Sequence, residues 1–159
     1  MRVFVVSDTH GSNGFLNKAL EEAGHVDYFL HMGDLEGSEY FIDAFVECPK
    51  KMIAGNNDFS ADFEDELEFE LEGHRIFMTH GHRYGVYAGV ERLYMEGVER
   101  GADIILFGHT HQPFLEEIND TLILNPGSIS LPRQKGRRPS YAIMDLKENG
   151  EVEVEVKYL

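Results

Sequence analysis

The sequence predicts an α/β fold in which two packed, mixed β-sheets form a sandwich with helices on its outer faces. In the first half of the chain, short apolar runs alternate with segments of helical periodicity. This alternation is typical of parallel strands joined by right-handed crossovers. In the second half, pairs of strand-like runs flank turn dipeptides such as Glu72-Gly73 and Asn149-Gly150. Such pairs form antiparallel hairpins.

The first half of the chain is expected to form a βαβαβ unit. We expect strands near 2–7, 26–32 and 50–54, with helices near 13–23 and 38–47 between them. The first helix is supported by apolar residues at helical spacing, namely Phe15, Leu16, Ala19, Leu20 and Ala23.

The second half is expected to add hairpins and one longer helix. The predicted hairpins pair 67–71 with 75–79, 114–118 with 121–124, and 141–146 with 151–157. The apolar run 104–107 is a further buried strand. The acidic run 62–72 is interleaved with apolar residues, and this pattern predicts a solvated edge strand. A helix near 86–100 is expected to bury Val90, Leu93 and Val98.

The chain of 159 residues suits a single domain, 1–159, with a substantial core. The net charge of −15 disfavours binding to long polyanions such as DNA, because nothing offsets the repulsion. The chain has one cysteine, Cys48, so it cannot form an intramolecular disulfide, and a reducing cytoplasm is expected. Cys48 is expected to pack in the core. No run has the length of a signal peptide core or of a membrane span, so we expect a soluble cytoplasmic protein.

Seven side chains of the kinds that bind metals stand just beyond five of the apolar runs. In α/β folds, ligands usually bind at the carboxyl ends of the strands. Any one of these side chains, taken alone, is as readily explained by strand capping or by exposure to water. The whole set indicates a metal site made of Asp8, His10, Asp34, Asn56, His80, His109 and His111.

The spacing within this set suits two cations. Residues i and i+2 of an extended strand project the same way, so Asp8 can act together with His10. His109 and His111 can likewise face one site, about 6–7 Å apart. That separation can serve two cations about 3.5–4 Å apart, as in two-metal hydrolytic sites. Asp34 has two carboxylate oxygens and can bridge the pair.

These motifs, in this order, closely resemble the calcineurin-like metallophosphoesterase superfamily. The motifs are Asp-x-His at Asp8, Gly-Asp at Asp34, Gly-Asn-x-Asp at Asn56, the strand-end His80 and Gly-His-Thr-His at 108–111. The small single-domain phosphodiesterases of bacteria and archaea are the most similar branch, and segments 125–128 and 131–133 are similar to that branch too. The resemblance covers nearly the whole chain and implies a β-sandwich flanked by helices.

The resemblance also implies how the ligands are shared between two metals. One metal would be held by Asp8, His10, Asp34 and His111. The second would be held by Asp34, Asn56, His80 and His109, which are also our candidates for the catalytic residues.

The chemistry expected from such a centre is hydrolysis of a phosphoester by in-line attack of a metal-bridging hydroxide on phosphorus. Two divalent cations contribute +4, and Asp8, Asp34 and the hydroxide leave about +1, so an anionic phosphate can bind within an acidic protein. No serine or cysteine nucleophile with an adjacent base is evident. The mixed donors suit Mn²⁺, Fe, Zn²⁺ or Ni²⁺ better than Mg²⁺ alone; we favour Mn²⁺.

One position departs from the family pattern. Many members carry a histidine directly after the metal-binding asparagine, where it is thought to assist the leaving group. Here that position is Asn57, and Asp58, the partner of that histidine in such enzymes, is expected to act only through hydrogen bonds or the turn. The resemblance therefore supplies no general acid.

The other histidines receive weaker interpretations. His82 either lines the pocket or lies in a surface loop, and His31 is expected in the core. His25 and His74 sit beside turn glycines and are expected to face solvent. The basic cluster is expected to be a solvated loop, although one of its arginines could bind a substrate phosphate; it comprises Arg133, Lys135, Arg137 and Arg138.

Three functions follow from these observations. The leading one is a metal-dependent phosphodiesterase acting on a small phosphoester, without duplex nucleic acid or membrane as a partner. This function is compatible with a homo-oligomer. A phosphomonoesterase or nucleotide phosphatase of the same fold is the second. The third is a non-catalytic protein-binding scaffold that resembles the retromer subunit with this fold. An intact ligand set discriminates against the scaffold, and all seven positions are present here.

Overall fold

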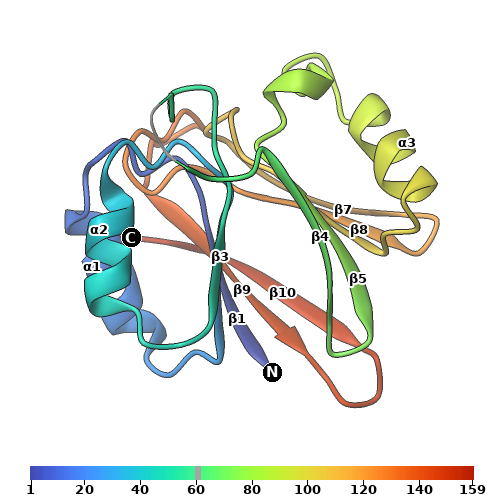
Figure 1. Cartoon of the computed structure of the whole chain (residues 1–159), viewed down its shortest axis with the longest axis horizontal. Coiled ribbons are helices and arrows are strands. Elements are labelled where there is room, and N and C mark those ends of the chain that lie inside the picture. Colours follow the sequence, from blue (N-terminus) through green and yellow to red (C-terminus); the bar gives the residue numbers. More distant parts are fainter. Residues whose placement is uncertain (60–61) are drawn as a thin grey trace.

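Two five-stranded sheets pack face to face in the computed structural model, which describes residues 1–59 and 62–159 (Figure 1). The strands of the first sheet are β1 (Arg2–Val6), β2 (Tyr28–His31), β3 (Lys50–Met52), β9 (Ser140–Leu146) and β10 (Val152–Tyr158). Those of the second sheet are β4 (Glu66–Leu71), β5 (His74–Thr79), β6 (Ile104–Leu106), β7 (Pro113–Ile118) and β8 (Thr121–Pro126). The predicted α/β sandwich is confirmed.

The first sheet has the order β10-β9-β1-β2-β3 and contains the expected βαβαβ unit. β1, β2 and β3 are parallel. The helices α1 (Gly14–Ala23) and α2 (Ser38–Phe45) form the crossovers between them. The last hairpin, β9 and β10, extends the sheet antiparallel to β1.

The second sheet has the order β4-β5-β6-β8-β7. β5, β6 and β8 are parallel, whereas β4 and β7 pair antiparallel with β5 and β8 as predicted hairpins. The acidic strand β4 lies at the edge of this sheet, as its alternating sequence predicts.

Three apolar clusters hold the layers together. The central cluster lies between the sheets and contains Val5 and Leu30 from one sheet and Met78 and Leu106 from the other, all fully buried. A second cluster packs α1 and α2 on the outer face of the first sheet, and a third packs α3 (Glu91–Glu99) on the outer face of the second sheet (Figure 1). Cys48 packs against the second cluster, in agreement with the core role expected for it.

The predicted helix near 86–100 is shorter than expected. A single 3₁₀ turn, His82–Tyr84, is followed by Gly85 and Gly89 at positive φ of 66° and 145°, so the regular helix α3 begins only at Glu91. The prediction that Val98 is buried is wrong, because its side chain is 46% exposed. Gly97 faces the sheet instead, where a Cβ would come within 2.3 Å of Ile105 Cδ1.

The helices of the described ranges, 1–59 and 62–159, include none with the length and apolar character needed to cross a bilayer.

Candidate metal centre

The seven candidate side chains follow the carboxyl ends of five strands, three in the first sheet and two in the second. Asp8 and His10 follow β1, Asp34 follows β2, Asn56 follows β3, His80 follows β5, and His109 and His111 follow β6. These loops meet at one edge of the sandwich, where parallel strands of an α/β sheet present their ligand-binding ends.

Four of these residues form a compact cluster of potential ligand atoms. Asp8, His10, Asp34 and His111 each offer one atom, and these four atoms all lie within 4.8 Å of one another. His111 Nε2 is 3.2 Å from both His10 Nε2 and Asp8 Oδ1. The four residues predicted to hold the first metal are therefore close enough to share one cation.

The three remaining candidates extend this cluster on the side of Asp34. His80 Nε2 lies 3.1 Å from Asn56 Oδ1 and 3.5 Å from Asp34 Oδ2. The ring of His109 packs against that of His80, with centroids 5.1 Å apart, and its backbone N–H donates to Asp8 Oδ2 at 3.2 Å. Asp34 thus stands between the two groups, with Oδ2 3.7 Å from His10 Nε2 and 3.5 Å from His80 Nε2.

The imidazoles are oriented so that their Nε2 atoms point into the centre. His80 Nδ1 donates to the carbonyl of Met32 at 2.6 Å, and His111 Nδ1 donates to the carbonyl of Leu131 at 2.7 Å. A neutral imidazole that donates from Nδ1 has a lone pair on Nε2. Such carbonyl contacts are the usual way in which a protein fixes the tautomer of a metal-binding histidine.

A buried carboxylate oxygen shows that this centre fits a cation. Asp8 is fully buried, and no hydrogen-bond donor among the described residues reaches its Oδ1. That oxygen faces the Nε2 atoms of His111, His10 and His80 at 3.2, 3.8 and 3.9 Å. Acceptors that crowd together in a dry site need a positive charge between them.

The pKa values of Asp8, Asp34 and His80 are shifted by the contacts between the carboxylates and the imidazoles. Burial opposes ionisation of Asp8, but the contact with His111 and the charge of His80 hold its pKa below the ordinary value. Burial also opposes ionisation of Asp34, and its contacts with His80 and Asn57 depress its pKa strongly. Burial disfavours protonation of His80, yet its contact with Asp34 and the charge of Asp8 raise its pKa.

Two other histidines are held neutral. Burial, reinforced by repulsion from His80, lowers the pKa of His109 to about 4. Burial lowers the pKa of His31 to about 4 as well, although Asp8 opposes the shift. A neutral His109 can offer a lone pair to a metal at physiological pH.

Five of the seven candidate residues have a left-handed backbone. Positive φ values of 46° to 69° occur at Asp8, His10, Asp34, His109 and His111. Such conformations are uncommon for residues other than glycine and cluster at functional sites. The expectation that each Asp-x-His or His-x-His pair projects from extended backbone is therefore wrong. β1 ends at Val6 and β6 ends at Leu106, so these pairs lie in tight loops beyond the strands.

Glycines beside the ligands allow the loops to approach one another. A Cβ on Gly55 would come within 2.2 Å of Asp34 Oδ1. A Cβ on Gly108 would come within 2.0 Å of Ser7 Oγ and 2.9 Å of Asp8 Oδ2. The glycines of the Gly-Asn and Gly-His motifs are thus needed for steric reasons, because a side chain there would collide with the neighbouring loop.

Several residues that the sequence analysis did not single out support the ligands. Glu36 contacts His10 Nδ1 through its carboxylate. The hydroxyls of Ser128 and Ser130 donate to the Asp8 carbonyl at 2.8 and 2.9 Å. The Gly-Ser-Ile-Ser run at 127–130 was the available signal, since it overlaps the segment 125–128 that resembles the phosphodiesterase branch.

Residues 57 and 58 take structural positions around Asp34. Asn57 donates to both oxygens of that carboxylate. Asp58 accepts hydrogen bonds from the backbone N–H groups of Leu35, Glu36 and Gly55. The expectation that Asp58 acts through hydrogen bonds in the turn is confirmed.

The other singled-out histidines divide between core, pocket and surface. His31 is buried and bonds to the Thr9 hydroxyl, as expected for the core. His82 lies beside the metal centre, with its ring 5.5 Å from that of His80 and 6.0 Å from that of His109. His25 faces solvent as predicted. The same prediction for His74 is wrong, because its side chain is 13% exposed and pairs with Asp103.

The basic cluster is exposed, and two of its arginines bind protein groups. Arg133 donates to the Tyr87 hydroxyl at 2.6 Å. Arg138 donates to the carbonyls of Tyr158 and Leu159 at the chain end. The solvated-loop interpretation of this cluster is consistent with the exposure of Arg133, Lys135, Arg137 and Arg138.

The chain is similar to known proteins over most of its length. The calcineurin-like phosphoesterase superfamily domain matches residues 1–149. The chain belongs to this superfamily. Among its relatives in the superfamily is a probable metallophosphoesterase, YsnB, of Bacillus subtilis, which is 38% identical over 152 residues, 94% of this chain and 86% of the relative. Phosphodiesterase YfcE of Escherichia coli is 40% identical, and the match covers 91% of this chain and 88% of the relative.

Solved structures agree with the superfamily fold. A predicted phosphoesterase of Streptococcus pneumoniae aligns with a TM-score of 0.78 and 29% identity, over 99% of this chain and 97% of that chain. Vps29 of Entamoeba histolytica aligns with a TM-score of 0.81 over 100% of this chain and 99% of its own, but with only 22% identity, so it shows the fold alone. The chain is thus a member of a metal-dependent phosphoesterase family with a candidate metal-binding cluster.

Proposed function

We propose that this protein is a dinuclear metal-dependent phosphodiesterase that hydrolyses small phosphodiesters by in-line attack of hydroxide on phosphorus. The observation that carries the proposal is the convergence of imidazole Nε2 and carboxylate oxygens around Asp8 Oδ1, a buried acceptor that no described donor reaches. The phosphodiesterase named among the 40%-identical relatives supports the choice of a diester.

The residues divide into two ligand sets that share Asp34. The first set is the compact cluster of Asp8, His10, Asp34 and His111. The second set is Asp34, Asn56, His80 and His109, whose contacts run from Asp34 through His80 to the other two. Mixed imidazole, carboxylate and amide donors suit Mn²⁺, which we favour, or Fe, Zn²⁺ or Ni²⁺, better than Mg²⁺.

Divalent cations in these two sets would supply a hydroxide at neutral pH and the positive charge that stabilises the phosphoryl group in the transition state. The protein's own part is to hold the ligands without rearrangement. The carbonyls of Met32 and Leu131 fix the rings of His80 and His111, and the serine hydroxyls at 128 and 130 fix the loop of Asp8. Fixed ligands cost no reorganisation when charge develops at phosphorus.

The chain does not place a histidine where many relatives in the superfamily have one. Asn57 stands there, and its amide is engaged with Asp34. An amide does not transfer a full proton to a departing oxygen. Substrates with good leaving groups are therefore expected to react best.

The substrate is expected to be small. The net charge of −15 means that the chain lacks the broad basic surface that a long polyanion needs. The positive charge for binding a phosphate would come from the metal centre. A duplex DNA fragment should bind weakly at physiological ionic strength. Tight, salt-sensitive binding of such a fragment would argue against a small-molecule substrate.

The deciding experiment compares a diester with its monoester. Bis(4-nitrophenyl) phosphate and 4-nitrophenyl phosphate are offered to the protein before and after removal of metal with EDTA, and then after addition of Mn²⁺. The proposal predicts faster hydrolysis of the diester, loss on chelation and recovery with Mn²⁺. Preference for the monoester would indicate a phosphomonoesterase. No metal-dependent hydrolysis of either ester would favour a non-catalytic scaffold.

A further inference from the structure

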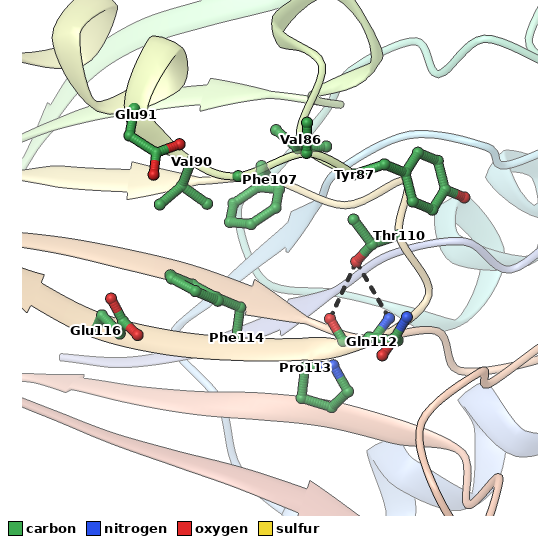
Figure 2. A pocket seen from close by; sticks show the side chains of 12 residues that line it. Val86, Tyr87, Val90, Glu91, Phe107, Thr110, Gln112, Pro113, Phe114 and Glu116 are labelled. Carbon is green, nitrogen blue, oxygen red and sulfur yellow. Dashed lines mark hydrogen bonds between the residues drawn. The ribbon is translucent and has the colours of Figure 1, made fainter.

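A groove opens beside the metal centre on the outer face of the second sheet. It lies between β7 and the loop that leads into α3, and its volume is about 460 Å³ (Figure 2). This volume is within the range of about 300–1,000 Å³ that is typical of small-molecule sites. The proposed chemistry of the metal centre does not use the groove, so the groove is free to take part in binding another portion of a ligand.

Two residues join the groove to the metal centre. Tyr87 lines the groove, and its ring packs against that of His109 with centroids 4.9 Å apart. Its hydroxyl donates to the His109 carbonyl at 3.0 Å. Thr110, which stands between the ligands His109 and His111 in the chain, also lines the groove (Figure 2). The groove therefore adjoins the loop that carries the candidate ligands His109 and His111.

The walls of the groove are apolar and aromatic near its middle. The rings of Phe107 and Phe114 meet edge to face, with centroids 5.9 Å apart, and Val86 and Val90 flank them (Figure 2). Phe107 is buried, whereas Phe114 is half-buried, so part of this aromatic surface is open to a ligand. The small residue Ala88 also lines the groove, so a larger side chain at this position would take up part of the groove volume.

The charges of the groove exclude an anion from it. Its lining includes the carboxylates of Glu91 and Glu116, and none of its described lining residues is basic. A departing phenolate or alkoxide develops negative charge, which these carboxylates and apolar walls disfavour. An uncharged ring that stays bonded to phosphorus meets no such penalty, and aromatic rings prefer the edge-to-face and offset contacts that Phe107 and Phe114 can offer.

We propose that this groove binds an uncharged aromatic group, the ester substituent that remains on phosphorus while the other departs. The proposal rests on the proposed phosphodiesterase function and narrows its substrates to diesters with one aryl or nucleobase-bearing substituent. The metal centre holds the phosphate, Tyr87 separates the two sites, and the groove selects the retained group.

The test uses two diesters with the same leaving group. Phenyl 4-nitrophenyl phosphate and methyl 4-nitrophenyl phosphate both release 4-nitrophenolate, so they differ in the retained substituent. The readout is the ratio of their kcat/KM values in the Mn²⁺-loaded protein. The substitution Ala88→Phe fills the groove and should lower this phenyl-to-methyl ratio roughly tenfold, which is the scale of losing one aromatic contact and its burial. Phe114→Leu, which removes the half-buried ring with little change in volume, should also lower the ratio.

A control places a new phenylalanine ring outside the groove. Leu115 is the neighbour of Phe114 on β7, is 41% exposed and does not line the groove. Leu115→Phe should keep the wild-type ratio. An unchanged ratio in both Ala88→Phe and Phe114→Leu would overturn the role of the groove while leaving the phosphodiesterase intact. Absence of metal-dependent hydrolysis of both esters by the wild-type protein would instead contradict the proposed function on which this inference rests.

Discussion

Asn57 holds both carboxylate oxygens of Asp34. Its backbone N–H donates to Oδ1 at 2.9 Å, and its side-chain amide donates to Oδ2 at 2.7 Å. These two bonds fix the rotation of the carboxylate, so that Oδ2 lies 3.7 Å from His10 Nε2 and 3.5 Å from His80 Nε2. Asn57 is therefore a positioning residue for the one ligand that both proposed metals share.

Removing the amide of Asn57 should weaken metal binding without abolishing it. Asn57→Ala keeps the backbone bond to Asp34 but frees the carboxylate to rotate. Partners of this kind are typically worth about 10–100-fold in metal affinity, so the Kd for Mn²⁺ measured by calorimetry should rise by that factor. Asn119→Ala is the control, because Asn119 uses its amide in an exposed bond to Tyr94. Equal affinities in Asn57→Ala and the wild type would contradict the positioning role.

The rate should depend steeply on the leaving group, because position 57 carries an amide. A histidine of pKa near ~6.5 can protonate a departing oxygen at neutral pH, whereas an amide cannot. Asn57→His should therefore flatten a plot of log kcat/KM against leaving-group pKa, and general-acid assistance is typically worth about 10²–10⁴-fold. Asp58 uses three of its roughly four acceptor positions on backbone N–H groups, so one is left to orient the new ring.

Equal slopes for the wild type and Asn57→His would mean that another group already protonates the leaving oxygen. They would equally follow if substrate binding rather than chemistry limited kcat/KM, which a fall of kcat/KM with rising solvent viscosity would reveal. Either outcome would contradict the account of residue 57.

Arg100 joins α3 to the edge strand β4 and should contribute to stability. Its guanidinium pairs with Glu66, Glu68 and Glu96 and lies 4.4 Å from the centroid of the Phe77 ring. A network of several charges that also packs on an aromatic ring contributes more to the stability of the fold than an isolated surface ion pair does. Arg100→Ala should lower the free energy of unfolding in urea by about 1–2 kcal/mol, with no change in Mn²⁺ affinity. A loss below the error of the measurement would contradict this role.

The same network should make stability depend on pH in the acidic range. Hydrogen bonds from Arg75 and then Arg100 lower the pKa of Glu68 below its ordinary value of 4.5. A carboxyl whose pKa is lower in the folded protein stabilises it above the unfolded value and loses that contribution as the pH falls through the folded value. The stability difference between the wild type and Arg100→Ala should therefore be full at pH 7 and shrink below about pH 4.5. A difference that grows on acidification would contradict this assignment.

Removal of metal should abolish activity and leave the chain folded. The central core between the sheets is continuous and contains none of the candidate ligands. The protein treated with EDTA should keep its far-ultraviolet circular dichroism while losing diester hydrolysis. Global unfolding on chelation would instead identify a structural metal.

The sequence predicted the layers and the ligand set because both follow from local patterns. Period-two and helical periodicities identified most strands and α1 and α2 within a few residues, and the turn dipeptides located the hairpins. The ligand-type residues stood out because they follow apolar runs. The predicted helix near 86–100 was wrong at its start because Gly85 and Gly89 break it, and Val98 was wrongly placed because Gly97 makes the close contact with the sheet.

The geometry inside the centre depended on contacts between distant loops. The sequence favoured extended backbone at Asp8 and His10, but both residues have positive φ. The bond from Asn57 to Asp34 spans 23 residues, and the bonds from the 128–130 loop to Asp8 span more than 100. The groove was likewise hidden, since its walls come from β7, the end of β6 and the loop before α3.

The most direct test of the account is the metal content of Asp34→Asn. The substitution keeps the shape of the side chain but removes the charge that the two proposed cations share, so both should be depleted and diester hydrolysis abolished. The measurement is elemental analysis of the wild-type and variant proteins after reconstitution with Mn²⁺ and removal of excess metal. A centre bridged by Asp34 should give two metals per chain in the wild type and fewer than one in the variant, with native circular dichroism in both. Two metals per chain retained in Asp34→Asn would contradict the bridged dinuclear centre.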